Sequence, residues 1–341
     1  MTARVVTFGE IMLRLNPPGY QRFTQAQSFE VTYGGGEANV ATSLAQYGLD
    51  AAFVTKVPKH EIGDCAIGWL RRYGVDTSNI LRGGERLGIY FLEAGASQRA
   101  SKVVYDRAHS SISQAKPGEF DWESIFKGAN WFHFTGITPA LGDDAAAVCL
   151  EAVQAAKKAG LKVSADLNFR KKLWTSEKAN KVMSGLMPYV DMAIGNEEDA
   201  EKVFGIKAHG SDVTGGTLKE EGYRYVAEEL VKRFGFKQVG ITLRESLSAS
   251  DNNWSALLYD NGKLYKSRKY NIHIVDRVGG GDSFGAGLIY SYITGKQPQE
   301  AVEYAVAASC LKHTILGDFN LVSVDEVEKL AGGDASGRVQ R

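Results

Sequence analysis

Over most of its length the chain alternates between short apolar segments and longer segments in which apolar residues recur with helical spacing. Apolar segments at 162–166 and 192–194 are each followed by a helical pattern, at 177–187 and 197–204. Repeated strand–helix units fold into a mostly parallel sheet with helices packed on both faces. The chain has 341 residues, 44% of them hydrophobic, which suffices for one large core. The sequence therefore predicts a three-layer α/β fold.

Two segments depart from this alternation. Residues 89–93 and 102–106 are predicted strands whose mixture of polar and apolar residues suits a sheet with one exposed face. Residues 15–33, broken by Pro17, Pro18 and Gly19, are expected to be irregular or extended. We expect both segments to form a small β layer, called the lid below. The predicted division is an α/β core of residues 1–14, 34–85 and 110–331, a lid of residues 15–33 and 86–109, and a disordered tail of residues 332–341.

Composition excludes several partners and compartments. Forty basic and forty acidic residues cancel, so neither a nucleic acid nor a membrane surface is expected as a partner. Cys65, Cys149 and Cys310 are far apart and form no CxxC pair, so we expect reduced thiols rather than disulfides or a zinc site. The N-terminal residues show no signal-peptide core, and no apolar run is long enough to span a membrane. A cytoplasmic protein is predicted.

The segment from Asp276 to Asp282 contains three consecutive glycines, Gly279, Gly280 and Gly281, followed by an apolar helical pattern. Glycines let backbone N–H groups approach a ligand closely, and a helix N-terminus attracts an anion such as phosphate. A carboxylate at Asp282 would then be placed to take a proton from a hydroxyl group that attacks this phosphate. The alternative is an ordinary glycine turn with an aspartate as helix N-cap. The segment by itself leaves both interpretations open.

Other nucleotide-binding classes are disfavoured. The chain has no GxxxxGK[ST], the phosphate-binding sequence of P-loop proteins. Asp318-Phe319-Asn320 is similar to the Asp-Phe-Gly of protein kinases, but the accompanying HRD and VAIK motifs are absent from the sequence. Neither glycine cluster, at 34–36 or at 279–281, follows the first strand as GxGxxG, which argues against a Rossmann dehydrogenase.

Polar residues follow several of the predicted strands. Asp166, Asn196 and Arg244 come at or just after strand ends, and Asp282 opens a helix. In an open α/β sheet, ligands bind beyond the carboxyl ends of the strands. We therefore expect these four side chains to converge on one site.

Two glycine motifs in combination make a resemblance specific. Residues 34–41, Gly-Gly-Gly-Glu-Ala-Asn-Val-Ala, and residues 276–282 resemble the two signatures of the ribokinase (PfkB) family of carbohydrate kinases. Asn196-Glu197-Glu198-Asp199 lies between them, where that family carries NxxE. Order and spacing match from about residue 5 to residue 330. The segments 9–15, 33–41, 243–246 and 276–284 are most similar to those of 2-keto-3-deoxygluconate kinases within the family.

The resemblance implies a ribokinase-like fold and a catalytic group. Asp282 would be the general base, and the amides of Gly279, Gly280 and Gly281 would form the anion hole for the transferring phosphoryl group. Asn196 and Asp199 would organise water bound to Mg²⁺ near the phosphates of ATP. The chain departs from the family pattern at two positions. Asp199 replaces the usual Glu, and Arg277 stands where many relatives have Thr, in a neighbourhood that often holds a monovalent cation, so dependence on such an ion is left open.

The resemblance also implies the ligand contacts. A carboxylate is best held by the bidentate fork of arginine. Alternation places Tyr105 and Arg107 on one face of a strand, with an exposed lid arginine as the alternative interpretation. Arg170 discriminates less, because fructokinases share its segment. Asn39 is open to two interpretations, a ligand contact or a role at the start of a helix. The implied sugar contacts are Gly35, Tyr90, Tyr105, Arg107, Arg170 and Asp318, and the implied nucleotide contacts are Asn196, Thr242, Arg244 and Ser309.

The functional hypothesis is ATP- and Mg²⁺-dependent phosphorylation of the terminal hydroxyl of a sugar acid, foremost 2-keto-3-deoxygluconate, giving 2-keto-3-deoxy-6-phosphogluconate. Two alternatives remain: another sugar kinase of this fold, such as a fructokinase, and a sugar sensor without catalysis. Intact Asp282 and its glycines argue against the sensor. A lid with an exposed apolar face predicts a homodimer, or a higher homo-oligomer, through the lid.

Overall fold

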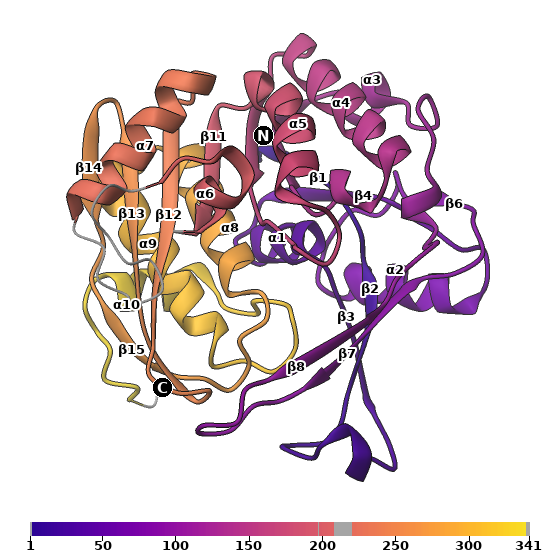
Figure 1. The fold of residues 1–341 in the computed structure, drawn as a ribbon, viewed down its shortest axis with the longest axis horizontal. Helices are drawn as coiled ribbons and strands as arrows, with labels where there is room; N and C mark the ends of the chain where they lie inside the picture. The colour runs from indigo at the N-terminus through magenta and orange to yellow at the C-terminus, as the bar shows by residue number, and fades with distance from the viewer. Residues whose placement is uncertain (1, 197, 208–219, 339–341) are drawn as a thin grey trace.

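A central sheet of nine strands forms the body of the molecule (Figure 1). The computed structural model describes residues 2–196, 198–207 and 220–338. The strands run in the order β14-β13-β12-β11-β10-β9-β1-β4, and β15 pairs with β13. Neighbours from β12 to β4 are parallel, whereas β13, β14 and β15 are antiparallel additions at one edge. The strands are β1 (Arg4–Phe8), β4 (Asp50–Val54), β9 (Ala129–Thr135), β10 (Lys162–Asp166), β11 (Met192–Asn196), β12 (Gln238–Ser246), β13 (Asp251–Asp260), β14 (Lys263–Lys266) and β15 (Tyr270–His273).

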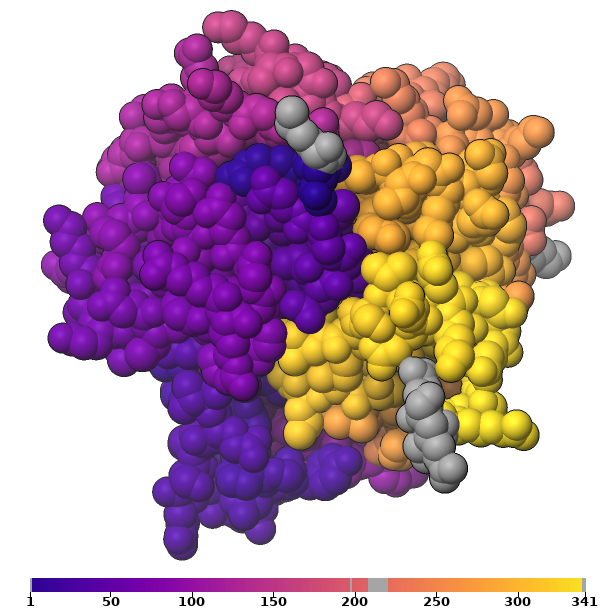
Figure 2. All heavy atoms as spheres, turned by 180° about the vertical axis from the view of Figure 1, so that it is seen from behind, coloured from indigo at the N-terminus to yellow at the C-terminus, as the bar shows by residue number. Residues whose placement is uncertain are grey.

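Helices cover both faces of this sheet, because alternate strand residues are apolar on both sides. In β1, Val6 and Phe8 pack into one hydrophobic core and Val5 into the other. The first core lies under α3 (Trp122–Ile125), α4 (Asp143–Lys158), α5 (Ser176–Leu186), α6 (Asp199–Phe204) and α7 (Glu220–Phe234). The second lies under α1 (Gly36–Gln46), α8 (Gly280–Ile293), α9 (Pro298–Lys312) and α10 (Val324–Ala331). Figure 2 shows this second face, where N-terminal segments lie beside the C-terminal helices. The predicted three-layer α/β fold is confirmed.

A separate four-stranded sheet projects from one side of the body, in the order β3-β2-β7-β8 (Figure 1). Its strands are β2 (Met12–Asn16), β3 (Glu30–Gly34), β7 (Gly88–Glu93) and β8 (Lys102–Asp106). Segments far apart in sequence thus form one lid. Its first strand begins at Met12, before the expected boundary at residue 15, because the start of β2 pairs with both Gly34 and Gly88. A short pair, β5 (Lys56–Val57) and β6 (Leu81–Arg82), and helix α2 (Glu61–Arg72) lie nearby in the chain.

The elements differ from the sequence-based expectations mainly at their ends. The apolar helical pattern from residue 298 to residue 316 predicts a longer helix than α9, which ends at Lys312. The expected helix start at Glu197 lies outside the described residues. Of the tail, residues 332–338 are exposed and carry no helix or strand, and residues 339–341 lie outside the described residues. Among the residues that the structure describes, no helix has the length and apolar character needed to cross a membrane.

Candidate active site

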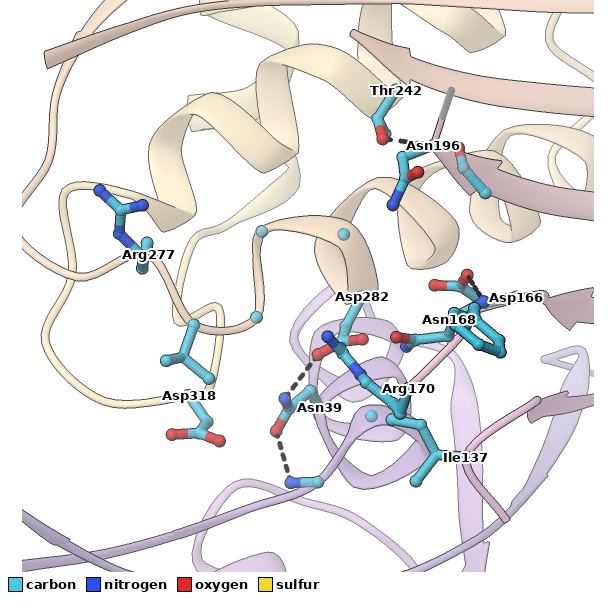
Figure 3. Close-up of a pocket in the computed structure, with 18 of the residues that line it drawn as sticks. Asn39, Ile137, Asp166, Asn168, Arg170, Asn196, Thr242, Arg277, Asp282 and Asp318 are labelled. Carbon is cyan, nitrogen blue, oxygen red and sulfur yellow. Dashed lines mark hydrogen bonds between the residues drawn. The ribbon is translucent and has the colours of Figure 1, made fainter. Parts of the chain in front are cut away.

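A cavity of about 440 Å³ lies where the carboxyl ends of the parallel strands meet the lid. Asp166, Asn196, Arg244 and Asp282 all line it, as expected from their positions at strand ends and at a helix start. Figure 3 shows side chains from both halves of the chain pointing into this space. Lid residues form one wall and the glycine loop, residues 276–281, forms part of another.

The glycine loop leads directly into α8. Gly279 has a φ of 85°, in the left-handed region, and a Cβ there would lie 2.1 Å from the carbonyl oxygen of Asp318. Only glycine fits this position. The first bond of the helix runs from the Ser283 N–H to the Gly279 carbonyl, so the amides of Gly280 and Gly281 have no carbonyl partner inside the helix. These amides lie at the positive end of the helix dipole and border the cavity, an arrangement that suits the binding of an anion.

Asp282 is held by an amide from the other glycine motif. The Nδ2 of Asn39 donates to its Oδ2 at 2.6 Å, and the backbone N–H of Gly35 donates to the Oδ1 of Asn39 (Figure 3). Removal from water raises the pKa of Asp282 to about 6, with Asp318 adding to the shift and Asn39, Arg170 and Lys312 opposing it. Asp282 is therefore a carboxyl group that loses its proton near neutral pH and lies beside an anion-binding helix start.

Asp318 lies in a buried network of charges between the lid and the glycine loop. Arg14, on β2, donates to Asp318 at 2.8 Å and to Asp276 at 2.5 Å. Tyr90, on β7, donates to both oxygens of Asp318 at 2.6 and 2.7 Å. Desolvation and the neighbouring Asp318 raise the pKa of Tyr90 well above its usual range, so it remains a hydrogen-bond donor. Tyr90 and Asp318 both line the cavity, as predicted. The Tyr90 hydroxyl, however, already donates to Asp318, and Asp318 also accepts from Arg14.

Arg107 lies just beyond β8 and is also paired. Its Nε donates to Glu10 at 2.9 Å, and its Nη2 bonds to the same carboxylate oxygen. Its guanidinium lies over the ring of Tyr105, 5.5 Å from the centroid. Arg107 and Tyr105 both line the cavity, which is the placement that alternation along the strand predicts. Glu10 fixes one edge of the guanidinium, which leaves the Nη1 group for a ligand.

Gly35 and Arg170 are two further residues that the sequence analysis assigned to the sugar. A Cβ on Gly35 would lie 1.9 Å from the carbonyl oxygen of Glu10, so only glycine lets these two backbone segments approach. Arg170 is exposed and, in Figure 3, points toward Asp282. Both residues line the cavity, as predicted.

Asn196 and Asp199 form a turn at the end of β11. Asn196 Oδ1 accepts the N–H groups of Glu198 and Asp199, at 2.8 and 3.2 Å. The oxygens of Asp199 accept the N–H groups of Phe169 and Asn196, at 3.0 and 2.9 Å. Asp199 is buried, and its hydrogen bonds join the loop after β10 to the end of β11. Both of its carboxylate oxygens therefore bind backbone N–H groups. The side-chain amide of Asn196 remains exposed to the cavity.

Another acidic group that lines the cavity is Asp166, at the end of β10. One of its oxygens accepts the N–H of Asn168 at 3.1 Å. Burial, and then repulsion by Asp199 and Asp282, raise the pKa of Asp166 well above its usual range. A hard cation between Asp166, Asn196 and bound phosphate would relieve this repulsion, because oxygen ligands are those that Mg²⁺ prefers. Thus the donor set fits a magnesium ion held through water. The described residues hold no cluster of three His, Cys, Asp or Glu side chains that would bind a metal by itself.

Four further positions that the sequence analysis named differ in their surroundings. Thr242 and Arg244, on β12, line the cavity near Asn196. Arg277 also lines it, donates to the Ala249 carbonyl at 2.8 Å, and has its pKa lowered by burial and by Arg244. Ser309 does not line the cavity. It is fully buried and donates to the Gly280 carbonyl at 2.7 Å, so it supports the glycine loop from behind.

Comparison with known proteins agrees with this geometry. The profile of the pfkB family of carbohydrate kinases matches residues 2–320. The chain belongs to the PfkB family of carbohydrate kinases. A solved 2-dehydro-3-deoxygluconokinase of Thermotoga maritima is 57% identical, with a TM-score of 0.94, and the match covers 98% of this chain and 99% of that one. A 2-dehydro-3-deoxygalactonokinase of Haloferax volcanii is 34% identical over 98% of this chain and 99% of its own.

A more distant solved structure, from Escherichia coli and in complex with ATP and Mg²⁺, shares the fold of this PfkB kinase. It is 20% identical, with a TM-score of 0.80, and the match covers 97% of this chain and 99% of that one. The predicted family, fold and carbohydrate kinase class are thereby confirmed.

Three residues at or behind the kinase site were not predicted from the sequence. They are Glu10, Arg14 and Lys312, which are buried and charged. A lone charged residue between apolar neighbours is the only signal that sequence offers for them, as with Arg14 in Met-Leu-Arg-Leu-Asn. Asn39, which the sequence left between a helix-start role and a ligand contact, bonds to the backbone before α1 and to Asp282 at once.

Proposed function

We propose that this kinase transfers the γ-phosphoryl group of ATP to the terminal hydroxyl of a 2-keto-3-deoxy sugar acid, with 2-keto-3-deoxygluconate as the preferred substrate. The observation that carries the proposal is the position of Asp282. Its carboxylate lies in the first turn of α8, beside the glycine loop, and lines a cavity that Arg107 of the lid region also lines.

In this proposal Asp282 accepts the proton of the substrate hydroxyl. Asn39 orients the carboxylate, and a pKa of about 6 leaves it ionised at neutral pH. The amides of Gly280 and Gly281, with Gly279 shaping the turn, stabilise the charge on the transferring phosphoryl group. Such a transition state needs positioning and electrostatic stabilisation more than covalent chemistry.

ATP would lie along the cavity from the glycine loop to β12, with Thr242 and Arg244 on its nucleotide side. The shared fold with a structure that holds ATP and Mg²⁺ supports this placement. Asn196 and Asp166 would hold Mg²⁺ through water, and the ion would neutralise phosphate charge during transfer. Asp199 would act indirectly, since its hydrogen bonds keep Asn196 and the loop after β10 in place.

The carboxylate of the sugar acid would bind at the lid. Arg107 offers its free Nη1 there, and Tyr105 packs against the guanidinium. Arg170 lies between this wall and Asp282. Gly35 brings bare backbone close to the sugar, and Tyr90 with Asp318 offers a rigid pair for a sugar hydroxyl. The names of the Thermotoga and Haloferax relatives, both kinases of 2-dehydro-3-deoxy sugar acids, support this class of substrate.

The test is a panel of acceptors with ATP and Mg²⁺. We expect kcat/KM to be greatest for 2-keto-3-deoxygluconate, lower for 2-keto-3-deoxygalactonate, and at least about 100-fold lower for fructose and ribose, which lack the carboxylate that Arg107 is proposed to bind. A preference for galactonate would change the named substrate but keep the acid class. A preference for fructose would refute the role of Arg107. Tight sugar binding without ATP turnover would favour a sensor.

A further inference from the structure

Lys312 is the most deeply buried lysine or arginine among the residues that the structure describes. It ends α9 and its side chain is completely buried, among the largest such side chains of the described residues. Burial of an ammonium group is costly unless carboxylates and hydrogen-bond acceptors surround it. Because this burial is costly, the charge of Lys312 is expected to have a function.

The end of α9 forms the floor of the glycine loop. Ser309 donates to the Gly280 carbonyl, and the ring of His313 fills the space that a Cβ on Gly280 would need. The Cε of Lys312 would lie 3.2 Å from a Cβ on Gly279. Its Nζ donates to the Ile315 carbonyl at 3.0 Å, in the loop that leads to Asp318. The ammonium group therefore lies directly behind the proposed anion hole.

Opposing influences act on the ammonium group of Lys312. Burial lowers its pKa, whereas the attraction of Asp276 and Asp318 opposes that shift, and Asp282 also attracts it. Arg14 binds the same two carboxylates from the lid side. Lys312 and Arg14 thus face the carboxylates of Asp276 and Asp318, and Asp282 adds a third carboxylate. Without Lys312 the group would carry an excess negative charge directly behind the place where phosphate binds.

Among the described residues, the hydrogen bonds behind the glycine loop leave no set of oxygen ligands there for a monovalent metal ion. An ion behind the glycine loop would need the Asp276 carboxylate and carbonyl groups of the loop after α9. Here Arg14 and the Gly317 N–H already bond to Asp276 Oδ2, and the Val278 N–H bonds to its Oδ1. The Ile315 carbonyl is taken by Lys312. The residues present do not fit a bound potassium ion.

We infer that Lys312 is a built-in cation of the phosphoryl-transfer site, which positions the glycine loop and makes a monovalent metal ion unnecessary. The inference rests on the proposed kinase reaction for its kinetic readout. Lys312 would act by positioning the loop and through its charge, since it does not itself line the cavity.

The first test uses the unaltered protein. Its rate of phosphoryl transfer and its Tm are measured with ATP and Mg²⁺ in tetramethylammonium chloride, an ion too large for such a site, and at equal ionic strength in potassium or ammonium chloride. We expect neither quantity to respond to the small cation, with rates equal to within about twofold. Activation by potassium of about tenfold or more, the size expected when a small ion supplies missing electrostatic stabilisation to a transition state, would overturn the inference.

The second test compares two variants that differ in the space they leave. Lys312→Ala removes the charge and opens a small cavity, whereas Lys312→Met removes the charge and fills it. Both should lose about 10- to 100-fold in kcat, because charge behind the anion hole stabilises the transferring group. Ammonium or potassium should restore Lys312→Ala by about tenfold and raise its Tm, and should leave Lys312→Met unchanged.

Lys296→Met is the matched control, since Lys296 precedes α9, is partly exposed in an ion pair with Glu328, and does not line the cavity. It should keep the rate and the ion response of the original protein. If Lys312→Met retains full activity, or if ammonium restores both variants equally, the built-in cation is refuted. If no acceptor is phosphorylated by any form, the proposed reaction fails, and the ion-dependent Tm of Lys312→Ala still decides the role of Lys312.

Discussion

At the scale of single residues, the chemistry depends on groups whose properties are set by neighbours distant in sequence. Asp282 owes its orientation to Asn39 and its raised pKa to burial in a cavity that also contains Asp318. Arg107 owes its position to Glu10. Each of these pairs joins the first part of the chain to a later one, so each can be tested by substitution.

Asp282→Asn should reduce kcat by about 100- to 10,000-fold, because an amide cannot accept the substrate proton. Sugar and ATP binding, measured by calorimetry, should change little, since the amide oxygen can still accept the bond from Asn39. A loss of less than tenfold would exclude Asp282 as the general base.

The rate of the original enzyme should depend on pH in the acid range. Asp282 acts only when ionised, so kcat/KM should fall as pH drops through about 6 and be roughly tenfold below its plateau at pH 5. The charged groups facing Asp282 are Asp318, Asp166, Arg170 and Lys312. An acid limb centred near pH 4, as for an ordinary aspartate, would contradict the assignment.

The same shift predicts an effect on stability. The folded-state pKa of Asp282 is raised above the unfolded value near 3.8, so the folded state holds this proton more tightly and loses relative stability as pH rises from about 3.8 to about 6. Asp282→Asn, which carries no charge, should therefore be more stable than the original protein at pH 7 to 8. The difference in Tm should shrink as pH falls toward 5. A difference that is constant with pH would contradict the raised pKa.

Arg107→Ala should raise KM for sugar acids by roughly 100-fold, the cost of one charge-assisted contact, and should affect neutral sugars much less. Arg86→Ala is the matched control, because Arg86 belongs to the same lid region but forms an exposed pair with Asp106. Equal losses for acidic and neutral sugars would make Arg107 a structural residue.

At the scale of elements, the lid is joined to the glycine loop by buried charges rather than by apolar contacts alone. Arg14 on β2 binds Asp276 in the loop and Asp318 after α9. Tyr90 on β7 reaches the same Asp318. The wall that is proposed to bind the sugar is therefore connected to the loop that is proposed to bind the phosphate.

Arg14→Met should lower the free energy of unfolding by about 3 to 5 kcal/mol, because it leaves two buried carboxylates without their partner. Chemical denaturation measures this loss. Arg14→Lys, which keeps the charge, should recover part of the stability and more of kcat than Arg14→Met does. If both variants were as stable and active as the original, the connection between lid and glycine loop would have no energetic role.

At the scale of the whole molecule, the lid presents an apolar row on the face away from the cavity. Register places Val31, Leu15, Phe91 and Val104 side by side across its four strands, and Val31 and Val104 are each 51% exposed. An exposed apolar row of this kind is typical of an interface between copies. We therefore propose that the kinase dimerises through the lid.

Light scattering after size-exclusion chromatography should give a mass near twice the 37.1 kDa of one chain. Val104→Glu, together with Val31→Glu, should convert this species to monomer by placing charge in the interface. Leu247→Glu is the control, since Leu247 is at least as exposed but lies outside the lid. A monomeric original protein, or a dimer unaffected by the double change, would refute this interface.

The sequence by itself determined the class of fold, the family and the catalytic candidates. Alternation of strands and helices predicts the parallel sheet because hydrophobic period and local propensity are properties of short segments. The glycine motif at 276–282 predicts a phosphate site because glycines let backbone N–H groups approach an anion closely at a helix start. The cavity was also anticipated, since strand ends must meet at one edge of a parallel sheet.

Tertiary structure alone decided what each polar side chain bonds to. Asp199 is used to join two loops, Ser309 lies behind the glycine loop, and Lys312 ends a helix as a buried cation. None of this follows from a linear pattern, because partners such as Arg14 and Asp318 are 304 residues apart. Burial and the placement of opposite charges arise only when distant segments pack, and they set the pKa values on which the proposed chemistry depends.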